Sequence, residues 1–351
     1  MKISRRRFYK TSRGRAIVIS LAVFLLVLFV SLAVGANIWY KNQLKPVSSD
    51  TTKTTFKITE GQLPRETASQ LQEKQLIRSA QAFLWFVRNN SLTNKLQAGT
   101  YELSPSNSTQ EIANILASGK VSSRPLTILP GKRIDQIRQT FIDAGFVATQ
   151  VDQALDPSNY RNHPALIAKP TDQNLEGYIF PETFKIDSST TPEQIIKLSL
   201  DQLSKVLTPK MIEEFNTQGL GIHRAITLAS IVEKEAANNS EKPVIASVFL
   251  NRLKIGMPLQ SDPTYKYAAF LKGIAPNRDI DSPYNTYKIV GLPPGPISNT
   301  SKASLESVAR PAQTDYLYFV AGDDNVTRFS KTLEEHQALV KQYCIKKCST
   351  F

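Results

Sequence analysis

The feature that most constrains this chain is an uncharged apolar run from Ala16 to Ile38. A run of roughly 23 such residues is long enough to cross a bilayer as one helix. Trp39 and Tyr40 follow it, as aromatic residues do at a membrane interface, and only basic charges precede it. The pattern predicts a cell-membrane protein with a single transmembrane helix at 16–38. Residues 1–15 form a basic cytoplasmic segment, the rest of the chain is extracytoplasmic, and the lipid bilayer is an expected partner.

The basic segment also accounts for much of the charge of the chain. The net charge is +13, and seven basic residues lie before Ala16, which leaves about +6 for the remainder of the 351 residues. No nucleic-acid partner is therefore predicted. A cleaved signal peptide ending at Val34-Gly35-Ala36 is the alternative to an anchor, although signal-peptide apolar regions usually span only about 7–15 residues. No Cys lies near the run, which excludes a bacterial lipid anchor.

The remainder has the mixed hydrophobic periodicities of an α+β protein. Residues 39–55 form a predicted polar linker, and residues 56–124 show the order strand, helix, helix, strand, helix. Residues 125–165 show a shorter copy of a strand, a Gly turn and a helix, and are predicted to form a second LysM-like or connecting module. The segments ITEGQ near residue 60 and ILPGKRIDQI near residue 130 look like degenerate repeats. This arrangement resembles the LysM class of glycan-binding modules.

Residues 166–351 are predicted to form a further α+β domain that carries the chemistry. Apolar spacing predicts a helix over about 223–237, and 257–264 is expected to be extended. Thr332 and Glu335 predict a capping box at the start of the last helix.

One carboxylate in the helix near residue 230 lies where a hydrophobic side chain is expected. At about 100° per residue, Glu235 falls on the apolar face with Ile231 and Val232, whereas Glu233 points to the opposite side. Burying a carboxyl group without a partner costs several kcal/mol and raises its pKa, which suits a general acid near neutral pH. Glu235 is therefore the candidate catalytic residue, and a salt-bridged structural Glu is the alternative.

Other common catalytic signatures are absent from the sequence. His163, His223 and His336 are scattered without ligand spacing, and there is no H-E-x-x-H, no G-x-S-x-G and no phosphate-binding glycine loop. No metal and no cofactor is predicted. Cys344 and Cys348 lie at i, i+4, and we interpret them as incidental tail residues, with a disulfide as the alternative.

Three segments combine amides, carboxylates and tyrosines, namely EKEAANNSE, NRLKIGMPLQSDPT and YNTYKIVGLPPGPISN. Amides and carboxylates bond sugar hydroxyls and aromatic faces stack on pyranose rings, so together the segments indicate a polysaccharide site. Residues 174–336 resemble the endolytic peptidoglycan transglycosylases, the MltG or YceG-like family. The motifs that carry this resemblance are EGYIFPETF at 176–184, ASIVEKEA at 229–236, ASVFLNRLKIGMPLQSDPT at 246–264, YNTY at 284–287, GLPPGPISN at 291–299 and YLYFVA at 316–321.

The resemblance also implies site residues. The family's catalytic acid is the second Glu of the E-K-E motif, which is Glu235 here, and Glu233 is kept as a secondary candidate with a structural pairing role. An ion pair between Arg252 and Asp262 that braces their loop is an equal alternative to glycan binding by these two residues. Glycan contacts are implied at the motif positions Glu182, Asn251, Arg252, Gln260, Asp262, Tyr284, Asn285 and Tyr287.

The function implied by the resemblance is that of a membrane-anchored lytic transglycosylase. Such an enzyme cleaves the β-1,4 bond between N-acetylmuramic acid and N-acetylglucosamine in nascent peptidoglycan strands and leaves 1,6-anhydro-muramic ends. Peptidoglycan strands are then the substrate, and peptidoglycan synthases and division proteins are candidate partners. The alternative is a non-catalytic, membrane-tethered peptidoglycan-binding scaffold. A pyridoxal-phosphate lyase would need a Schiff-base Lys and a phosphate cup, neither of which the sequence shows.

Overall fold

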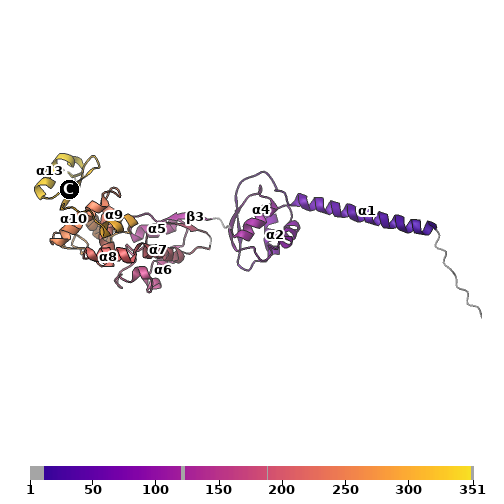
Figure 1. The fold of residues 1–351 in the computed structure, drawn as a ribbon, viewed down its shortest axis with the longest axis horizontal. Coiled ribbons are helices and arrows are strands. Elements are labelled where there is room, and N and C mark those ends of the chain that lie inside the picture. The colour runs from indigo at the N-terminus through magenta and orange to yellow at the C-terminus, as the bar shows by residue number, and fades with distance from the viewer. Residues whose placement is uncertain (1–11, 120–122, 188, 349–351) are drawn as a thin grey trace, which may run out of the picture. The chain divides into compact units, whose positions relative to one another are not determined.

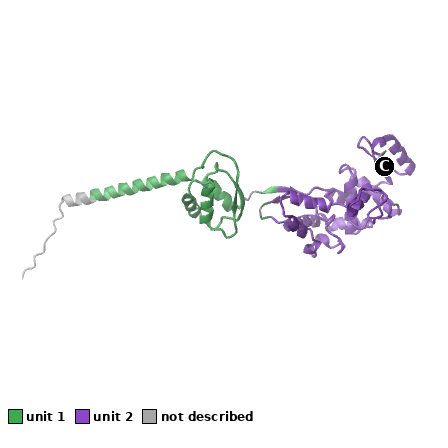
Figure 2. Cartoon of the chain, turned by 180° about the vertical axis from the view of Figure 1, so that it is seen from behind, with its two compact units in different colours: residues 1–124, 187–189 green, residues 125–186, 190–351 purple. Residues whose placement is uncertain are grey.

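The computed structural model describes residues 12–119, 123–187 and 189–348, which fold into two compact units (Figure 1). Unit 1 comprises residues 1–124 with 187–189, and unit 2 comprises residues 125–186 and 190–351 (Figure 2). Helices alternate with short two-stranded sheets, which confirms the predicted α+β class.

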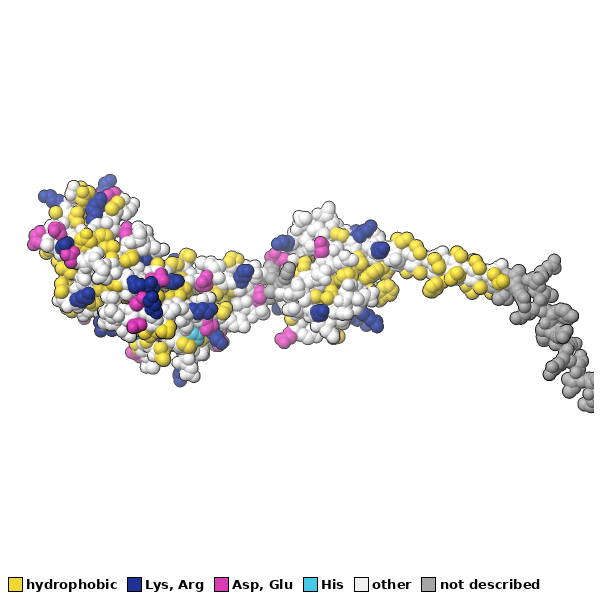
Figure 3. Space-filling model, viewed as in Figure 1, with side chains coloured by type: hydrophobic (Ala, Val, Ile, Leu, Met, Phe, Trp, Pro, Cys, Tyr) yellow, Lys and Arg dark blue, Asp and Glu magenta, His cyan; other side chains and the backbone are white. Residues whose placement is uncertain are grey.

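Unit 1 begins with α1 (Ser12–Gln43), the one described helix that is long and apolar enough to cross a membrane. The candidate span Ile19–Gln43 contains an 18-residue window with a mean hydropathy of 2.7, none of which is buried in the protein, and hydrophobic side chains cover the surface of the helix (Figure 3). A helix of this length and composition close to the N-terminus fits a membrane anchor or a signal sequence. It extends beyond Ile38, so the first part of the polar linker expected at 39–55 is helical.

The end of α1 is attached to the rest of unit 1 by several contacts. Leu44 is buried, and its carbonyl oxygen accepts a hydrogen bond from the N–H of Thr109 at 3.0 Å. The Arg78 guanidinium donates to a backbone carbonyl oxygen just after the helix at 2.8 Å. The rings of Tyr40 and Trp85 lie 5.9 Å apart. The helix therefore continues into the folded unit through a packed junction.

The body of unit 1 has the predicted order strand, helix, helix, strand, helix. β1 (Thr54–Ile58) pairs antiparallel with β2 (Gly99–Leu103), and α2 (Pro64–Glu73), α3 (Ala80–Asn89) and α4 (Thr109–Ser118) complete the unit. Alternate strand residues point inward because successive side chains lie on opposite faces of a strand. The core that results includes the buried side chains of Phe56, Phe83, Tyr101, Leu103 and Ile112.

Unit 2 contains the remaining elements. Its strands are β3 (Arg124–Thr127), which begins at the boundary, β4 (Thr183–Ile186), β5 (Tyr318–Ala321) and β6 (Thr327–Ser330). Its helices are α5 (Ile134–Asp143), α6 (Ala148–Ala154), α7 (Pro192–Val206), α8 (Pro209–Thr217), α9 (Ile222–Glu235), α10 (Lys242–Lys254), α11 (Asp262–Lys272), α12 (Lys302–Ala309), α13 (Leu333–Tyr343) and α14 (Ile345–Cys348), with 3-10 helices at Pro157–Tyr160 and Pro164–Leu166. Helices α8, α10 and α12 pack around α9, which places α9 at the centre of the unit.

Residues 125–165 belong to unit 2 and contribute to its hydrophobic core. β3 pairs with β4, and the N–H of Ile128 donates to the Glu182 carbonyl oxygen at 2.9 Å. Leu126 and Ile137 are buried in the same hydrophobic core as the long helices of unit 2. One short strand, the helices α5 and α6 and a 3-10 helix have too little apolar surface to form a core alone, so this segment completes the neighbouring core.

The segment expected to be extended at 257–264 contains the start of a helix. α11 begins at Asp262, with Ser261 as its N-cap residue and Pro263 in its first turn. It ends before Gly273, whose φ of +65° favours glycine. The expectation was wrong for residues 262–264, because Ser-Asp-Pro is a signal that starts a helix.

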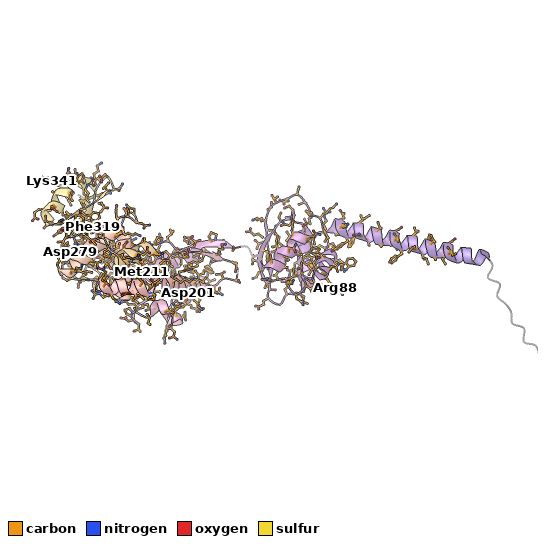
Figure 4. All side chains as sticks on the ribbon, viewed as in Figure 1. Arg88, Asp201, Met211, Asp279, Phe319 and Lys341 are labelled. Carbon is orange, nitrogen blue, oxygen red and sulfur yellow. A yellow bond between two sulfur atoms is a disulfide. The ribbon has the colours of Figure 1, made fainter. Side chains whose placement is uncertain are left out.

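The C-terminal part of unit 2 is a small hairpin covered by a helix. β5 and β6 pair antiparallel, and α13 packs against both strands. Thr332 and Glu335 form the predicted capping box at the start of α13. Phe319 of β5, labelled in Figure 4, meets Phe249 of α10 edge to face at 5.7 Å. This contact joins the hairpin to the helical core.

The two cysteines are bonded to each other. Cys344 and Cys348 form a disulfide where α13 meets α14, with their Cα atoms 5.4 Å apart. The interpretation of these residues as incidental tail residues is therefore wrong, and the disulfide alternative holds. Disulfides persist in oxidising compartments, such as the outer side of a cell membrane.

Candidate active site

Helix α9 carries both glutamates of the E-K-E sequence. Residues 225–232 of this helix are buried without a break, so the helix is enclosed on all sides rather than on one apolar face. Its C-terminal end emerges from the core, and Glu235, which is partly exposed, is the last helical residue. The carboxyl group at this position lies between the apolar core and the solvent.

The Glu235 carboxyl group accepts a short hydrogen bond. Ser261 Oγ donates to Glu235 Oε1 at 2.6 Å. Desolvation raises the pKa of Glu235 to about 7, against the opposing effect of the Ser261 hydrogen bond, and the nearby Asp262 carboxylate adds to the rise. A large share of Glu235 is therefore protonated near neutral pH, as a general acid requires.

Glu233 has a different environment. Its side chain is 8% exposed and lies 3.1 Å from the ammonium group of Lys242, which is 5% exposed. Ser301 donates to Glu233 Oε2 through its backbone N–H at 3.0 Å and its Oγ at 2.6 Å, and Ser304 Oγ donates to the same oxygen. Burial opposes ionisation, but these hydrogen bonds and Lys242 hold the pKa of Glu233 below its ordinary value. Ionised Glu233 thus joins α9 to α10 and to the start of α12.

Asp262 lies at the start of α11, within electrostatic range of Glu235. Its Oδ1 accepts hydrogen bonds from Tyr287 Oη at 2.7 Å and from Arg278 Nη2 at 3.2 Å. Lys266 Nζ lies 3.9 Å from its Oδ2. The cationic partners of Asp262 are thus Arg278 and Lys266. The alternative of an ion pair with Arg252 is wrong, because the Arg252 guanidinium donates to backbone carbonyl oxygens instead.

Gln260 and Tyr284 lie in the same region. Gln260 is exposed and has a φ of +47°, a left-handed conformation that is uncommon outside glycine and often marks functional sites. Its backbone N–H donates to the Thr286 carbonyl oxygen at 3.1 Å. Tyr284 is partly buried and packs on Tyr267 of α11, with ring centroids 4.9 Å apart. These contacts join the start of α11 to the YNTY loop.

The other predicted glycan contacts are engaged elsewhere. The Asn251 amide donates to two backbone carbonyl oxygens at 2.8 and 3.1 Å, and buried Arg252 donates to two others at 2.6 and 2.7 Å. The buried Asn285 amide does the same at 2.7 and 2.8 Å. These three side chains hold loops in place, because their donors are used by the backbone. Glu182 is exposed beside β4, where its carboxylate accepts a hydrogen bond from the N–H of Thr183 at 2.9 Å.

Sequence reasoning missed Glu176, which opens the motif that also contains Glu182. Glu176 is only 6% exposed. Its Oε2 accepts hydrogen bonds from the N–H of Ile134, the first residue of α5, and from Tyr267 Oη, both at 3.2 Å. Its Oε1 has no hydrogen-bond partner among the described residues. Desolvation raises the pKa of Glu176 to about 7, so unit 2 holds a second carboxyl group that is largely neutral below that pH.

Replacing Glu176 by Gln should therefore change stability only at higher pH. The folded-state pKa of about 7 exceeds the ordinary value of 4.5, so wild-type stability is lost as the pH rises from 4.5 through 7. Glu176→Gln removes this loss. We expect the thermal unfolding midpoint of the variant to rise relative to that of the wild type between about pH 5 and about pH 8. The midpoint of the exposed control Glu213→Gln should change with pH as the wild-type midpoint does. Parallel curves for both variants would contradict a buried neutral carboxyl group at Glu176.

The fold and the site together define an α+β protein with one candidate general acid at a helix end. Ser261 holds this acid by a hydrogen bond, and Asp262 at the start of α11 lies near it and accepts a hydrogen bond from Tyr287. Within residues 12–119, 123–187 and 189–348, no group of three or more His, Cys, Asp and Glu side chains is arranged to hold a metal ion.

Comparison with known proteins identifies the family. Residues 56–342 match the YceG-like family. The chain is 36% identical over 331 residues to the endolytic murein transglycosylase of Bacillus subtilis (strain 168), covering 89% of this chain and 91% of that protein. It is 31% identical over 368 residues to the protein of the same name from Streptococcus pneumoniae serotype 2 (strain D39), covering 95% of this chain and 66% of that longer protein.

A solved structure gives the same result. The crystal structure of a yceG-like protein from Listeria monocytogenes is 35% identical and has a TM-score of 0.54, covering 82% of this chain and 99% of that one. The chain therefore belongs to the YceG-like family, as its motifs indicated.

Proposed function

We propose that this chain is a membrane-anchored lytic transglycosylase that cleaves the β-1,4 bond between N-acetylmuramic acid and N-acetylglucosamine in peptidoglycan strands. The observation that carries the proposal is Glu235, a partly buried acid with a pKa of about 7 at the emerging end of α9. The name that the Bacillus and Streptococcus relatives bear, endolytic murein transglycosylase, supports this reaction and supports cleavage within a strand.

Glu235 acts twice in the proposed mechanism. Its protonated carboxyl group donates a proton to the bridging oxygen while the bond from that oxygen to C1 of the muramic residue breaks. The resulting carboxylate removes the proton from the C6 hydroxyl of the same residue, and the C6 oxygen bonds to C1. The products are a free hydroxyl on N-acetylglucosamine and a 1,6-anhydro-muramic end. Glu235 ends protonated as it began, and no water is consumed.

The proposed substrate contacts are exposed or partly exposed side chains around the start of α11 and in the YNTY loop. These are Gln260, Asp262, Tyr284 and Tyr287. An amide and a carboxylate bond sugar hydroxyls, and tyrosine rings stack on pyranose faces. Ser261, which the sequence did not single out, is the positioning residue for Glu235.

We also propose that α1 is an uncleaved anchor, with the N-terminus in the cytoplasm and both units outside it. The seven basic residues before Ala16 support this orientation. The bilayer is then one partner, and peptidoglycan synthases or division proteins are further candidates. The order of strands and helices in unit 1 supports a LysM-like, glycan-binding role. Deletion of residues 56–119 should accordingly lower co-sedimentation of the protein with insoluble peptidoglycan.

Product analysis tests the proposed reaction. Purified full-length protein is incubated with uncrosslinked glycan strands, and the fragments are identified by mass spectrometry. We expect 1,6-anhydro ends, each lighter by one water than a reducing end. If the fragments carry reducing ends instead, the reaction is hydrolysis and the proposed transglycosylation is wrong. Cleavage within strands gives fragments of many lengths at early times, whereas terminal cleavage gives one short product.

The alternative is a non-catalytic, membrane-tethered scaffold that binds peptidoglycan. It accounts for α1 and unit 1, but it gives no role to an acid with a raised pKa at the surface of unit 2. Strands that stay intact while the protein sediments with them would favour the scaffold.

A further inference from the structure

Four basic side chains gather around Lys234, near the end of α9 that carries Glu235, and the mechanism above does not use them. They come from three separate parts of unit 2. Lys132 and Arg133 lie in the loop before α5, Lys234 lies in the last turn of α9, and Lys266 lies in α11. We define these four residues as the basic cluster.

Direct contacts hold the cluster together. The Lys234 ammonium group donates a hydrogen bond to the Gly131 carbonyl oxygen at 3.1 Å, which places it against the loop that carries Lys132 and Arg133. The Arg133 guanidinium lies over the ring of Phe270, 4.0 Å from its centroid. Lys266 lies one helical turn before this ring, on the same face of α11.

The cluster has more positive than negative charge. Arg133 pairs with Asp135 at 2.9 Å, and Lys266 lies 3.9 Å from Asp262. In the part of the chain that the structure describes, Lys132 and Lys234 form no ion pair. Partial burial lowers the pKa of Lys234, and Arg133, Lys132 and Lys266 lower it further, whereas Glu233 opposes them but already pairs with Lys242. An anion bound here would relieve this repulsion between like charges.

The cluster adjoins the candidate acid. Lys234 immediately precedes Glu235 in the chain, and Lys266 lies within electrostatic range of the Glu235 carboxyl group. An anionic group that binds to the cluster would therefore be a part of the substrate that lies close to the bond that is cut. The sugar rings of a peptidoglycan strand are uncharged, and its carboxylates are carried by the stem peptides attached to muramic residues.

We propose that Lys132, Arg133, Lys234 and Lys266 form a subsite that binds stem-peptide carboxylates. This inference rests on the proposed function, because it assigns a substrate feature to the same site. The ammonium groups of the three lysines are carried on flexible side chains and suit a mobile peptide, since they reach a carboxylate in many geometries. The subsite would thus favour muramic residues that still carry their peptides.

The variants Lys132→Gln and Lys132→Gln/Lys234→Gln test the subsite in the full-length protein. Their substrates are uncrosslinked strands with intact stem peptides and the same strands stripped by an amidase, in which the lactyl carboxylate that the amidase frees is converted to an amide. We expect the double variant to raise KM about three- to tenfold on intact strands, with kcat and the rate on stripped strands close to wild type. Added salt should weaken the wild-type preference for intact strands. Lys272→Gln is the control, because Lys272 is exposed and lies in α11 outside the basic cluster.

Equal losses on intact and stripped strands would overturn the subsite. The double variant also removes the hydrogen bond of the Lys234 side chain, which could disturb the loop. The single variant Lys132→Gln controls for this effect, because the Lys132 side chain forms no hydrogen bond among the described residues. A second anion source is the diphosphate on a lipid-linked strand, so strands with and without it are compared. A loss that follows the diphosphate instead of the stem peptide would also overturn the proposal.

A binding measurement separates this inference from the proposed reaction. Glu235→Gln protein is titrated with labelled intact strands, and the lysine substitutions are added to that background. The dissociation constant should rise about three- to tenfold, whether or not the wild type cleaves strands. Absence of anhydro ends with the wild type would contradict the reaction alone, whereas unchanged binding would contradict the subsite alone.

Discussion

Replacing Glu235 by Gln will abolish strand cleavage. The amide resembles the protonated carboxyl group in shape, but it cannot donate an acidic proton or take one back. Because the proposed reaction needs both transfers from one group, we expect the initial rate to fall at least about 10³-fold. The measurement is the release of anhydro-ended fragments by full-length protein in detergent. Wild-type activity itself should decline as the pH rises above about 7, because the acid deprotonates.

Stability measurements separate this loss of activity from misfolding. The folded-state pKa of Glu235, about 7, exceeds the ordinary value of 4.5, so its ionisation lowers wild-type stability as the pH rises from 4.5 through 7. The Gln variant has no such group. Its unfolding midpoint should match the wild type at low pH and exceed it at about pH 8. Full activity in a folded Glu235→Gln protein would remove Glu235 from the mechanism.

Replacing Glu233 by Gln should instead damage the fold. The change leaves the ammonium group of Lys242, which is 5% exposed, without its carboxylate partner. Loss of one partner from a buried ion pair costs about 3–5 kcal/mol in the free energy of unfolding. At roughly 2–4 °C for each kcal/mol, we expect the thermal unfolding midpoint of full-length protein in detergent to fall by roughly 6–20 °C.

The exposed pair of Lys302 and Glu306 is the matched control for Glu233. Its charged atoms lie 3.7 Å apart, and the side chains are 63% and 40% exposed. Glu306→Gln should cost less than about 1 kcal/mol. Adding Lys242→Met to Glu233→Gln should recover part of the stability, because the unpaired buried charge is removed. Equal small shifts for Glu233→Gln and the control would show that Glu233 does not support the fold.

The sequence predicted the elements around the site better than it predicted the contacts within it. Apolar spacing placed a helix at about 223–237, and the structure ends that helix at Glu235. The partner of Glu235 could not be predicted, because Ser261 lies 26 residues further along the chain and reaches it only through the packing of α10 and α11. The same holds for Glu233, whose serine partner Ser301 lies 68 residues away.

Burial of single polar residues was the other limit of the sequence. The motif EGYIFPETF contains Glu176 and Glu182, and nothing in its local pattern shows which of them is buried. Burial of Glu176 depends on Ile134 and Tyr267, which distant segments bring to it. Asn285 lies in a polar loop, yet it is fully buried and holds that loop together. Such roles depend on tertiary packing, which periodicity within one segment does not encode.

The packed junction after α1 makes the orientation of the rest of unit 1 depend on the tilt of α1. A flexible linker of about 17 residues would have a root-mean-square end-to-end distance of roughly 20–25 Å and would let unit 1 turn freely. Hydrogen bonds from Thr109 and Arg78 to the segment just after α1 exclude that freedom. A transmembrane helix adjusts its tilt when its apolar length differs from the thickness of the bilayer. In an anchored protein, membrane thickness would therefore set which face of unit 1 turns towards the lipid headgroups.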